Sequence, residues 1–128
     1  YYLAVREGNA IYRLDVKSGR MYRFAGTGEK GFAGDGGDAR KAKLSGPKGV
    51  ACAPDGSLYI ADTENHAIRR VNSKGVITTV AGTGERGDGP DGDPRKAKLA
   101  RPHGVFVDRA GVLYISDTEN HRIRMLTR

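Results

Sequence analysis

The chain contains the same segment twice. Leu58–Arg70 reads LYIADTENHAIRR, and Leu113–Met125, 55 residues further on, reads LYISDTENHRIRM. A period of this order is typical of arrays in which each repeat is one supersecondary unit that cannot bury its apolar surface alone. The repeat therefore constrains the fold before any single motif is considered, because neighbouring units must stack and share a core.

The repeat extends over the whole chain. Ala25–Val50 matches Ala81–Val105 with one residue deleted in a glycine-rich stretch, and in a looser first copy Tyr2 aligns with Tyr59. The 128 residues thus hold about two and a third repeats, within the length of one domain. We divide the chain into a first partial repeat with its connection (1–44), a complete repeat (45–99) and a last partial repeat (100–128).

Composition excludes some classes of protein. The chain is 38% hydrophobic and 29% charged, as in folded rather than disordered domains. No apolar run approaches the ~18 residues of a transmembrane helix, so we expect no membrane partner. Cys52 is the only cysteine, which excludes an internal disulfide. Because it aligns with Val107, we expect a small buried side chain.

Each repeat carries four strand signals, called a to d here, with turn residues between them. In the complete repeat they are Gly49–Ala53, Leu58–Ala61, Ala67–Val71 and Val76–Ala81. Short connections make neighbouring strands antiparallel, and consecutive apolar residues indicate sheets that are covered on both faces. Four-stranded antiparallel sheets repeated around an axis are the blades of a β-propeller. We therefore predict an all-β chain of ten strands in three blades, of which the first lacks strand a and the last lacks strand d.

The connection from strand d to the next strand a predicts a short helical turn. Asp93 suits an N-cap and Pro94 the first helical position. Leu99 and its counterpart Leu44 are expected to fill the space beside strand a.

These residues resemble a known family. The pattern PxGV, LYIxDTENHxIR and a glycine-rich loop, at Pro47–Val50, Leu58–Arg70, Pro102–Val105 and Leu113–Met125, strongly resembles the NHL repeat. The resemblance implies a β-propeller, most often of about six blades. The first copy departs from the pattern, since Val5 replaces the Asp of DTENH and the turn Arg6–Asn9 is expected to be one residue shorter. Three partial blades would leave an incomplete ring, or a ring that closes by oligomerisation.

Antiparallel parity places the b–c turns and the d–a connections on one face of the propeller. This loop-rich face is where we would look for a ligand, since binding residues concentrate on loops held by a rigid scaffold. The same residues also suit a purely structural role, because Asp and Asn stabilise tight turns, and Arg69 or Arg124 would pair with the Asp of its own or the next blade. The candidate binding residues are Asp62, Glu64, Asn65, His66, Arg95, Lys96, His103, Asp117, Glu119, Asn120 and His121.

The sequence favours a non-catalytic binding or assembly module. We predict no catalytic residues, metal ligands or cofactor, because no nucleophile motif occurs and equivalent histidines on neighbouring blades are too far apart for one ion. Expected partners are a second copy or the missing blades, and a protein or glycan ligand. The net charge of +7 keeps single-stranded RNA as an alternative. Part of a propeller hydrolase or lyase is a further alternative, and an exported location is implied by resemblance alone.

Overall fold

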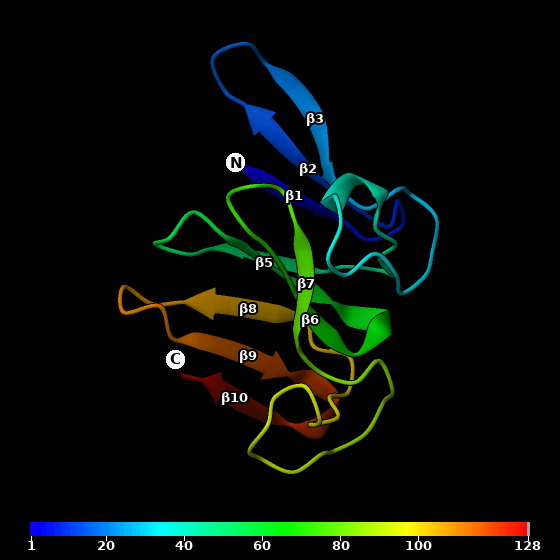
Figure 1. Ribbon diagram of the computed structural model, residues 1–128, viewed down its shortest axis with the longest axis vertical. Helices are drawn as coiled ribbons and strands as arrows, with labels where there is room; N and C mark the ends of the chain where they lie inside the picture. Colours follow the sequence, from blue (N-terminus) through cyan, green and yellow to red (C-terminus); the bar gives the residue numbers. More distant parts are fainter. Residues whose placement is uncertain (128) are drawn as a thin grey trace.

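Three antiparallel sheets stack along the molecule in chain order (Figure 1). The computed structural model describes residues 1–127. The strands are β1 (Tyr2–Val5), β2 (Ala10–Asp15), β3 (Arg20–Ala25), β4 (Gly49–Cys52), β5 (Leu58–Asp62), β6 (Ala67–Val71), β7 (Ile77–Ala81), β8 (Gly104–Val107), β9 (Leu113–Asp117) and β10 (Arg122–Leu126). Three short 3₁₀ turns are η1 (Ala39–Lys41), η2 (Thr63–Asn65) and η3 (Thr118–Asn120).

The sheets are the three predicted blades. Blade 1 is β1-β2-β3, blade 2 is β4-β5-β6-β7 and blade 3 is β8-β9-β10. The strand tally of b-c-d, a-b-c-d and a-b-c is therefore confirmed, and so is the all-β class. The ring is open among the described residues, since the two apolar cores join blade 1 to blade 2 and blade 2 to blade 3, and neither joins blade 3 to blade 1.

Blade 2 lies between two apolar cores. One face packs on blade 1 through a cluster that includes Ile11, Leu44 and Ile60. The opposite face packs on blade 3 through a cluster that includes Tyr59, Leu99 and Ile115. Leu44 and Leu99 are both buried beside strand a of the following blade, as predicted. Stacking is thus the main source of apolar burial, because each sheet is too thin to form a core alone.

The d–a connections differ from each other in detail. In the first, Asp38 caps η1 by accepting a hydrogen bond from the Arg40 amide. In the second, Asp93 accepts from the Arg95 amide at 3.0 Å, but the segment forms only turns. The Asp93 carbonyl also accepts from the amides of Lys96 and Ala97, at 3.0 and 3.2 Å, so the predicted cap and the single helical turn after it are both present, although only the first copy is long enough to form a 3₁₀ helix.

Two expectations for single residues are wrong. Cys52 is exposed, although its counterpart Val107 is buried against blade 2. Val50 on the same strand face packs toward blade 1, so Cys52 points to where a strand a of blade 1 would lie, and the sheet has none. The turn Arg6–Asn9 is not shortened: four residues separate Val5 from its partner Ala10, as four separate Asp62 from Ala67.

The b–c turns and the d–a connections come together on one side, as expected from strand parity. In Figure 1 this side, which carries η1 and η2, is at the right, and the a–b turns are at the left. No helix among the described residues is long and apolar enough to cross a membrane.

Candidate functional site: the loop-rich face and the seam between blades

Each DTENH segment folds as one turn of 3₁₀ helix closed by a left-handed residue. His66 has φ 51° after η2, and His121 has φ 57° after η3. Asn9 in blade 1 has φ 50°, so it occupies the same position although the sequence there is different. Non-glycine residues adopt this conformation rarely, and Asn and His are among those that do so most often.

A buried ion pair fixes the turn of blade 2. Nη1 of Arg69 donates to Oδ2 of Asp62 at 3.0 Å, and both side chains are fully buried. Nη2 donates to Oδ1 of Asp35 at 2.9 Å and to the Ala33 carbonyl at 3.1 Å, both in the glycine-rich loop. The guanidinium also lies 4.9 Å from the centre of the Phe32 ring. One arginine therefore ties the b–c turn to the loop that precedes its blade.

Blade 3 repeats this arrangement more loosely. Arg124 donates to Asp117 at 3.3 Å and to Asp91 at 3.1 Å, and Asp91 is 88% exposed. Both expected pairs form within one blade, not between blades. In blade 1 the equivalent positions hold Val5 and Tyr12, so both partners are replaced together. A single replacement would have left an uncompensated charge in the interior.

The other oxygen and amide groups of the motif hold the loops as well. Oδ1 of Asp62 accepts from the Ser45 amide at 2.8 Å, and Nδ2 of Asn65 donates to the Gly31 carbonyl at 2.7 Å. Asp117 and Asn120 make the matching bonds to Ala100 and Gly87. Burial raises the pKa of Asp62, opposed by the hydrogen bonds from Asn65 and Ser45 and by Arg69. Burial makes Asp62 and Asp117 parts of the scaffold rather than ligand contacts, and Asn65 and Asn120 serve the same network.

The seam between blades 2 and 3 is the contact of Thr63–His66 with residues 100–103. The hydroxyl of Thr63 donates to the Pro102 carbonyl at 2.7 Å, and Nδ1 of His66 accepts from the Arg101 amide at 3.1 Å. Because Nδ1 accepts, the proton of the neutral imidazole is assigned to Nε2. Between blades 1 and 2, Oδ1 of Asn9 accepts from the Gly46 amide at 2.9 Å in the same way.

Arg101 adds a charged bridge to this seam. Its guanidinium donates to Oε1 of Glu64 at 2.7 Å and to Oε2 of Glu119 at 2.9 Å, so it links carboxylates of two blades. The bonds from Arg101 lower the pKa of both Glu64 and Glu119, and they raise the pKa of Arg101 itself. Burial lowers the pKa of His66 below its usual value.

Two basic side chains meet where strands a begin. Nζ of Lys48 lies 3.4 Å from Nε2 of His103, its counterpart on the next blade. The strands approach closely here, since a Cβ on Gly49 would come within 2.7 Å of the His103 carbonyl. Burial, followed by the charge of Lys48, lowers the pKa of His103. The two blades thus present Lys48, Glu64, Arg101, His103 and Glu119 as a row of mixed charge, called the seam row below.

The predicted residues therefore divide into three groups: scaffold residues, seam residues and isolated surface residues. The scaffold group is Asp62, Asn65, Asp117 and Asn120, and His103 belongs to the seam. Glu64, His66 and Glu119 are brought together by Arg101, which the sequence-based set did not include. The sequence did contain a signal for Arg101, because Arg101-Pro102 aligns with Gly46-Pro47 just before strand a. His121 is exposed on blade 3. Arg95 and Lys96 are exposed on the second d–a connection, where Lys96 lies 3.9 Å from Asp93.

The three histidines do not form a metal site with acidic residues or Cys52. Within residues 1–127, no group of three or more His, Cys, Asp or Glu side chains is placed to hold a metal ion. The polar groups described above make hydrogen bonds and ion pairs within the loops and between blades. The surface of this face can therefore bind a ligand through ion pairs and hydrogen bonds.

Comparison with protein families agrees with this architecture. A model of the teneurin NHL domain matches residues 13–87, and a model of the NHL repeat matches residues 99–125. The chain belongs to the NHL-repeat family. The buried pairs and seams described above are thus the internal contacts of NHL blades in this chain.

Two curated relatives match nearly the whole of this NHL chain. The chloroplastic protein SUPPRESSOR OF QUENCHING 1 of Arabidopsis thaliana is 36% identical over 134 residues, which cover 98% of this chain and 12% of that protein. NHL repeat-containing protein 2 of Homo sapiens is 30% identical over 134 residues, which cover 98% and 18%. The NHL chain therefore spans less than a fifth of either relative.

A solved structure shares the blade arrangement. An auxiliary nutrient binding protein from Bacteroides thetaiotaomicron superposes with a TM-score of 0.78 at 29% identity, covering 98% of this chain and 34% of that one. The NHL blades of this chain thus correspond to about a third of that protein.

Proposed function

We propose that this NHL chain is a non-catalytic scaffold module whose free blade faces bind further blades of the same type and whose loop-rich face binds a protein ligand. The chain covers only a small part of the relatives named above, which is in keeping with one module of a larger assembly.

One comparison within the chain carries the assembly proposal. Ile11, Ile68 and Ile123 are equivalent residues on strand c of the three blades. Ile11 and Ile68 are fully buried, each covered by the blade that follows, whereas Ile123 is 66% exposed. Phe106 and Met125 on blade 3 are also exposed, at 61% and 60%. This face of blade 3 therefore carries exposed apolar side chains, and one of them, Ile123, lies at a position that a neighbouring blade covers in blades 1 and 2.

The energetics favour covering this face. Burying one Ile, Phe or Met side chain is worth about 1.5–3 kcal/mol, and contiguous apolar patches are rarely bare on a monomer. In the isolated chain, the free face of blade 1, with Leu3 and Val5 exposed, is the matching surface. A second copy would bring this face of its blade 1 onto blade 3, and the contact joins unlike surfaces head to tail.

Light scattering after size exclusion tests the assembly. We expect a mass of twice 13.8 kDa or more, and a monomer for the Ile123→Lys variant with an unchanged far-UV spectrum. Val16→Lys is the control, because Val16 is also exposed, at 65%, but lies in a turn. A wild-type chain that stays monomeric at all concentrations contradicts the proposal.

The seam row supports the proposal of a protein ligand. Salt-bridged residues of both signs are displayed there on a backbone that the buried Asp62–Arg69 pair holds in place. Such a surface gives electrostatic complementarity to a partner of matching pattern. Peptides selected by phage display against the wild-type chain should be lost on the Lys48→Glu variant and retained on Arg70→Gln, which changes the opposite side of the blade. Equal retention on both variants would rule out the seam row.

Single-stranded RNA is the second candidate for the loop-rich face. It is favoured by the exposed cations Lys41, Arg95 and Lys96 on the d–a connections. Affinity for an oligouridine probe should then fall steeply with salt, and should fall further in an Arg95→Gln/Lys96→Gln variant. Weak binding that is insensitive to salt would exclude this candidate.

A further inference from the structure

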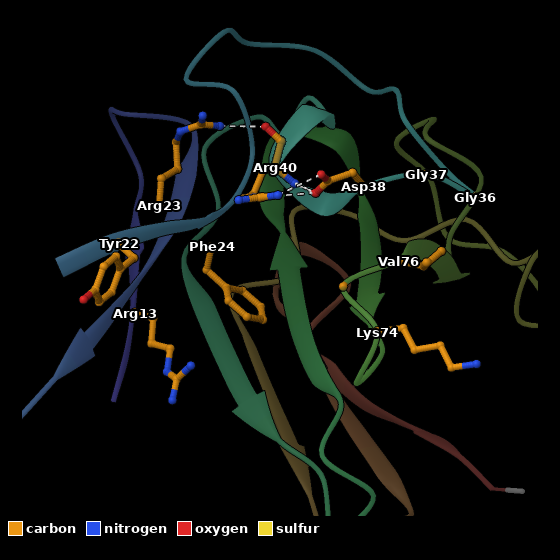
Figure 2. A pocket seen from close by; sticks show the side chains of 11 residues that line it. Arg13, Tyr22, Arg23, Phe24, Gly36, Gly37, Asp38, Arg40, Lys74 and Val76 are labelled. Atoms are coloured by element: carbon orange, nitrogen blue, oxygen red, sulfur yellow. Dashed lines mark hydrogen bonds and ion pairs between the residues drawn. The ribbon is translucent and has the colours of Figure 1, made fainter.

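A cavity of about 570 Å³ lies at the outer rim, away from the seam row. Its walls are the β2–β3 hairpin of blade 1 and the Lys74–Val76 turn of blade 2, and the first d–a connection around Asp38 closes one end (Figure 2). A volume of this size is in the range of small-ligand sites in proteins.

The cavity is strongly cationic. Arg13, Arg23, Arg40 and Lys74 line it, against one carboxylate, Asp38. Asp38 is already paired with Arg40 at 3.2 Å. Within residues 1–127, no hydrogen-bond or ion-pair partner is found for the side chains of Arg13 and Lys74, which come from different walls. Figure 2 shows the ammonium of Lys74 directed away from Arg13, so these are two separate positive charges of the lining and not a converging pair.

An aromatic surface lies beside one of these cations. Tyr22 is the cross-strand partner of Arg13 and is 49% exposed. Phe24, two residues further along the same strand, also lines the cavity and is held edge-on by Tyr2 at 4.9 Å. Figure 2 shows Tyr22 and Arg13 close together on one wall, with Phe24 beside them and Lys74 on the other wall.

Arg23 gives the upper end of the cavity a fixed positive charge. Its Nη1 donates to the carbonyls of Gly26 and Arg40, both at 2.6 Å, and Figure 2 shows the Arg23–Arg40 contact. The guanidinium is thus oriented before any ligand arrives, which reduces the entropy cost of binding.

These residues are specific to blade 1 and are not demanded by the repeat. The counterpart of Arg13 in blade 2 is Arg70, which is neutralised by Asp55 at 3.0 Å. The counterparts of Tyr22 and Phe24 are Thr78 and Val80. The same structural position therefore has an ion pair and small side chains in blade 2, and a free arginine with two aromatic rings in blade 1.

We propose that this rim cavity binds a planar ring that carries a phosphate group, as in a nucleoside monophosphate. The lining carries more cations than carboxylates, which favours an anionic group, and a phosphate monoester has a charge of about −2. Arginine and lysine are the usual partners of phosphate oxygens, and an exposed tyrosine ring is a stacking surface for a base. The proposal is independent of the assembly and of the seam row.

The test is titration calorimetry of the chain with adenosine 5′-monophosphate, adenosine and inorganic phosphate as separate probes. We expect the monophosphate to bind about tenfold or more tightly than either of the other two, because only it makes both kinds of contact. Arg13→Gln and Tyr22→Leu should each weaken it about fivefold to tenfold. Arg70→Gln is the matched control and should leave the affinity unchanged.

Loss of binding in the two variants can be distinguished from loss of folding. Both test residues are exposed, so unchanged unfolding midpoints should accompany their weaker binding. Absence of monophosphate binding overturns the proposal, and so does binding that Arg13→Gln leaves intact. Phosphate alone binding as tightly as the monophosphate overturns the contact with the ring.

Discussion

Replacing Arg69 by methionine should strongly destabilise the chain. Methionine fills a similar volume but removes the hydrogen bonds to Asp62, Asp35, Ala33 and Lys43. The carboxylate of Asp62 would then remain in the interior, fully buried, with only Ser45 and Asn65 as donors.

The magnitude follows from that burial. Removing one partner of a buried pair costs about 3–5 kcal/mol, whereas an exposed pair is worth about 0–1 kcal/mol. With a typical urea dependence, this is a shift of the unfolding midpoint of about 2 M. Arg122→Met is the control on the adjacent blade, because Arg122 pairs with Asp88 at the surface and should cost about 1 kcal/mol or less.

The residues of blade 1 suggest a double variant that avoids part of this loss of stability. Combining Asp62→Val with Arg69→Tyr copies Val5 and Tyr12, and it should be more stable than either single variant because no fully buried charge is left unpaired. Asp35 also loses its partner Arg69, but its side chain is 40% exposed. The recovery of stability should be incomplete, because Asp62→Val removes the acceptor of the buried Ser45 amide. Leaving that amide without a partner costs about 1–3 kcal/mol. Urea unfolding followed by far-UV circular dichroism measures the wild type, the four single variants and the double variant. If Arg69→Met costs no more than Arg122→Met, the reasoning about burial is wrong.

Three further predictions concern the seams and the turns. His66→Asn should keep stability at pH 7 and flatten its pH dependence. Because the pKa of His66 is lowered in the folded state, its contribution to wild-type stability is complete above pH 6.5 and is lost as the pH falls through the folded-state pKa. An equal decline in the variant would show that His66 is not responsible. Arg101→Gln should weaken the loss of stability below pH 4.5, because the lowered pKa values of Glu64 and Glu119 make their contribution present above that pH and lost below it; acid titrations of the two proteins that run parallel would contradict this. Gly82→Ala should cost far more than Gly75→Ala in thermal unfolding: both have positive φ, but only at Gly82 would a Cβ meet backbone, at 2.3 Å from the His66 carbonyl. Similar melting temperatures would refute the close approach.

The repeat predicted the strands because local and long-range signals agreed. Turn residues marked the strand ends, and both faces of each strand were apolar, so the blade boundaries and the burial of Leu44 and Leu99 followed. Cys52 was predicted incorrectly because its burial depends on a neighbouring strand that the first sheet does not contain, and no alignment within one repeat shows this.

The candidate site was predictable as a face but not as a set of contacts. Strand parity placed the DTENH turns and the connections together, yet it could not separate the buried Asp62 from the accessible Glu64 two residues away. Arg101 was missed because its counterpart is Gly46, so the bridge between two carboxylates appears at one seam only. The rim cavity lies in the outer strands, where the first copy follows the repeat least.

The seam has a consequence for how such chains grow. Each junction needs one side-chain acceptor on a left-handed residue and one amide from the next connection, whether the acceptor is Asn9 or His66. Neither partner depends on which blade lies beyond. A duplicate of residues 45–99 inserted after residue 99 would therefore find its own acceptor and amide already in place at both ends. The length of the array is thus open to change by unequal exchange of whole units, with no compensating substitution at the joints.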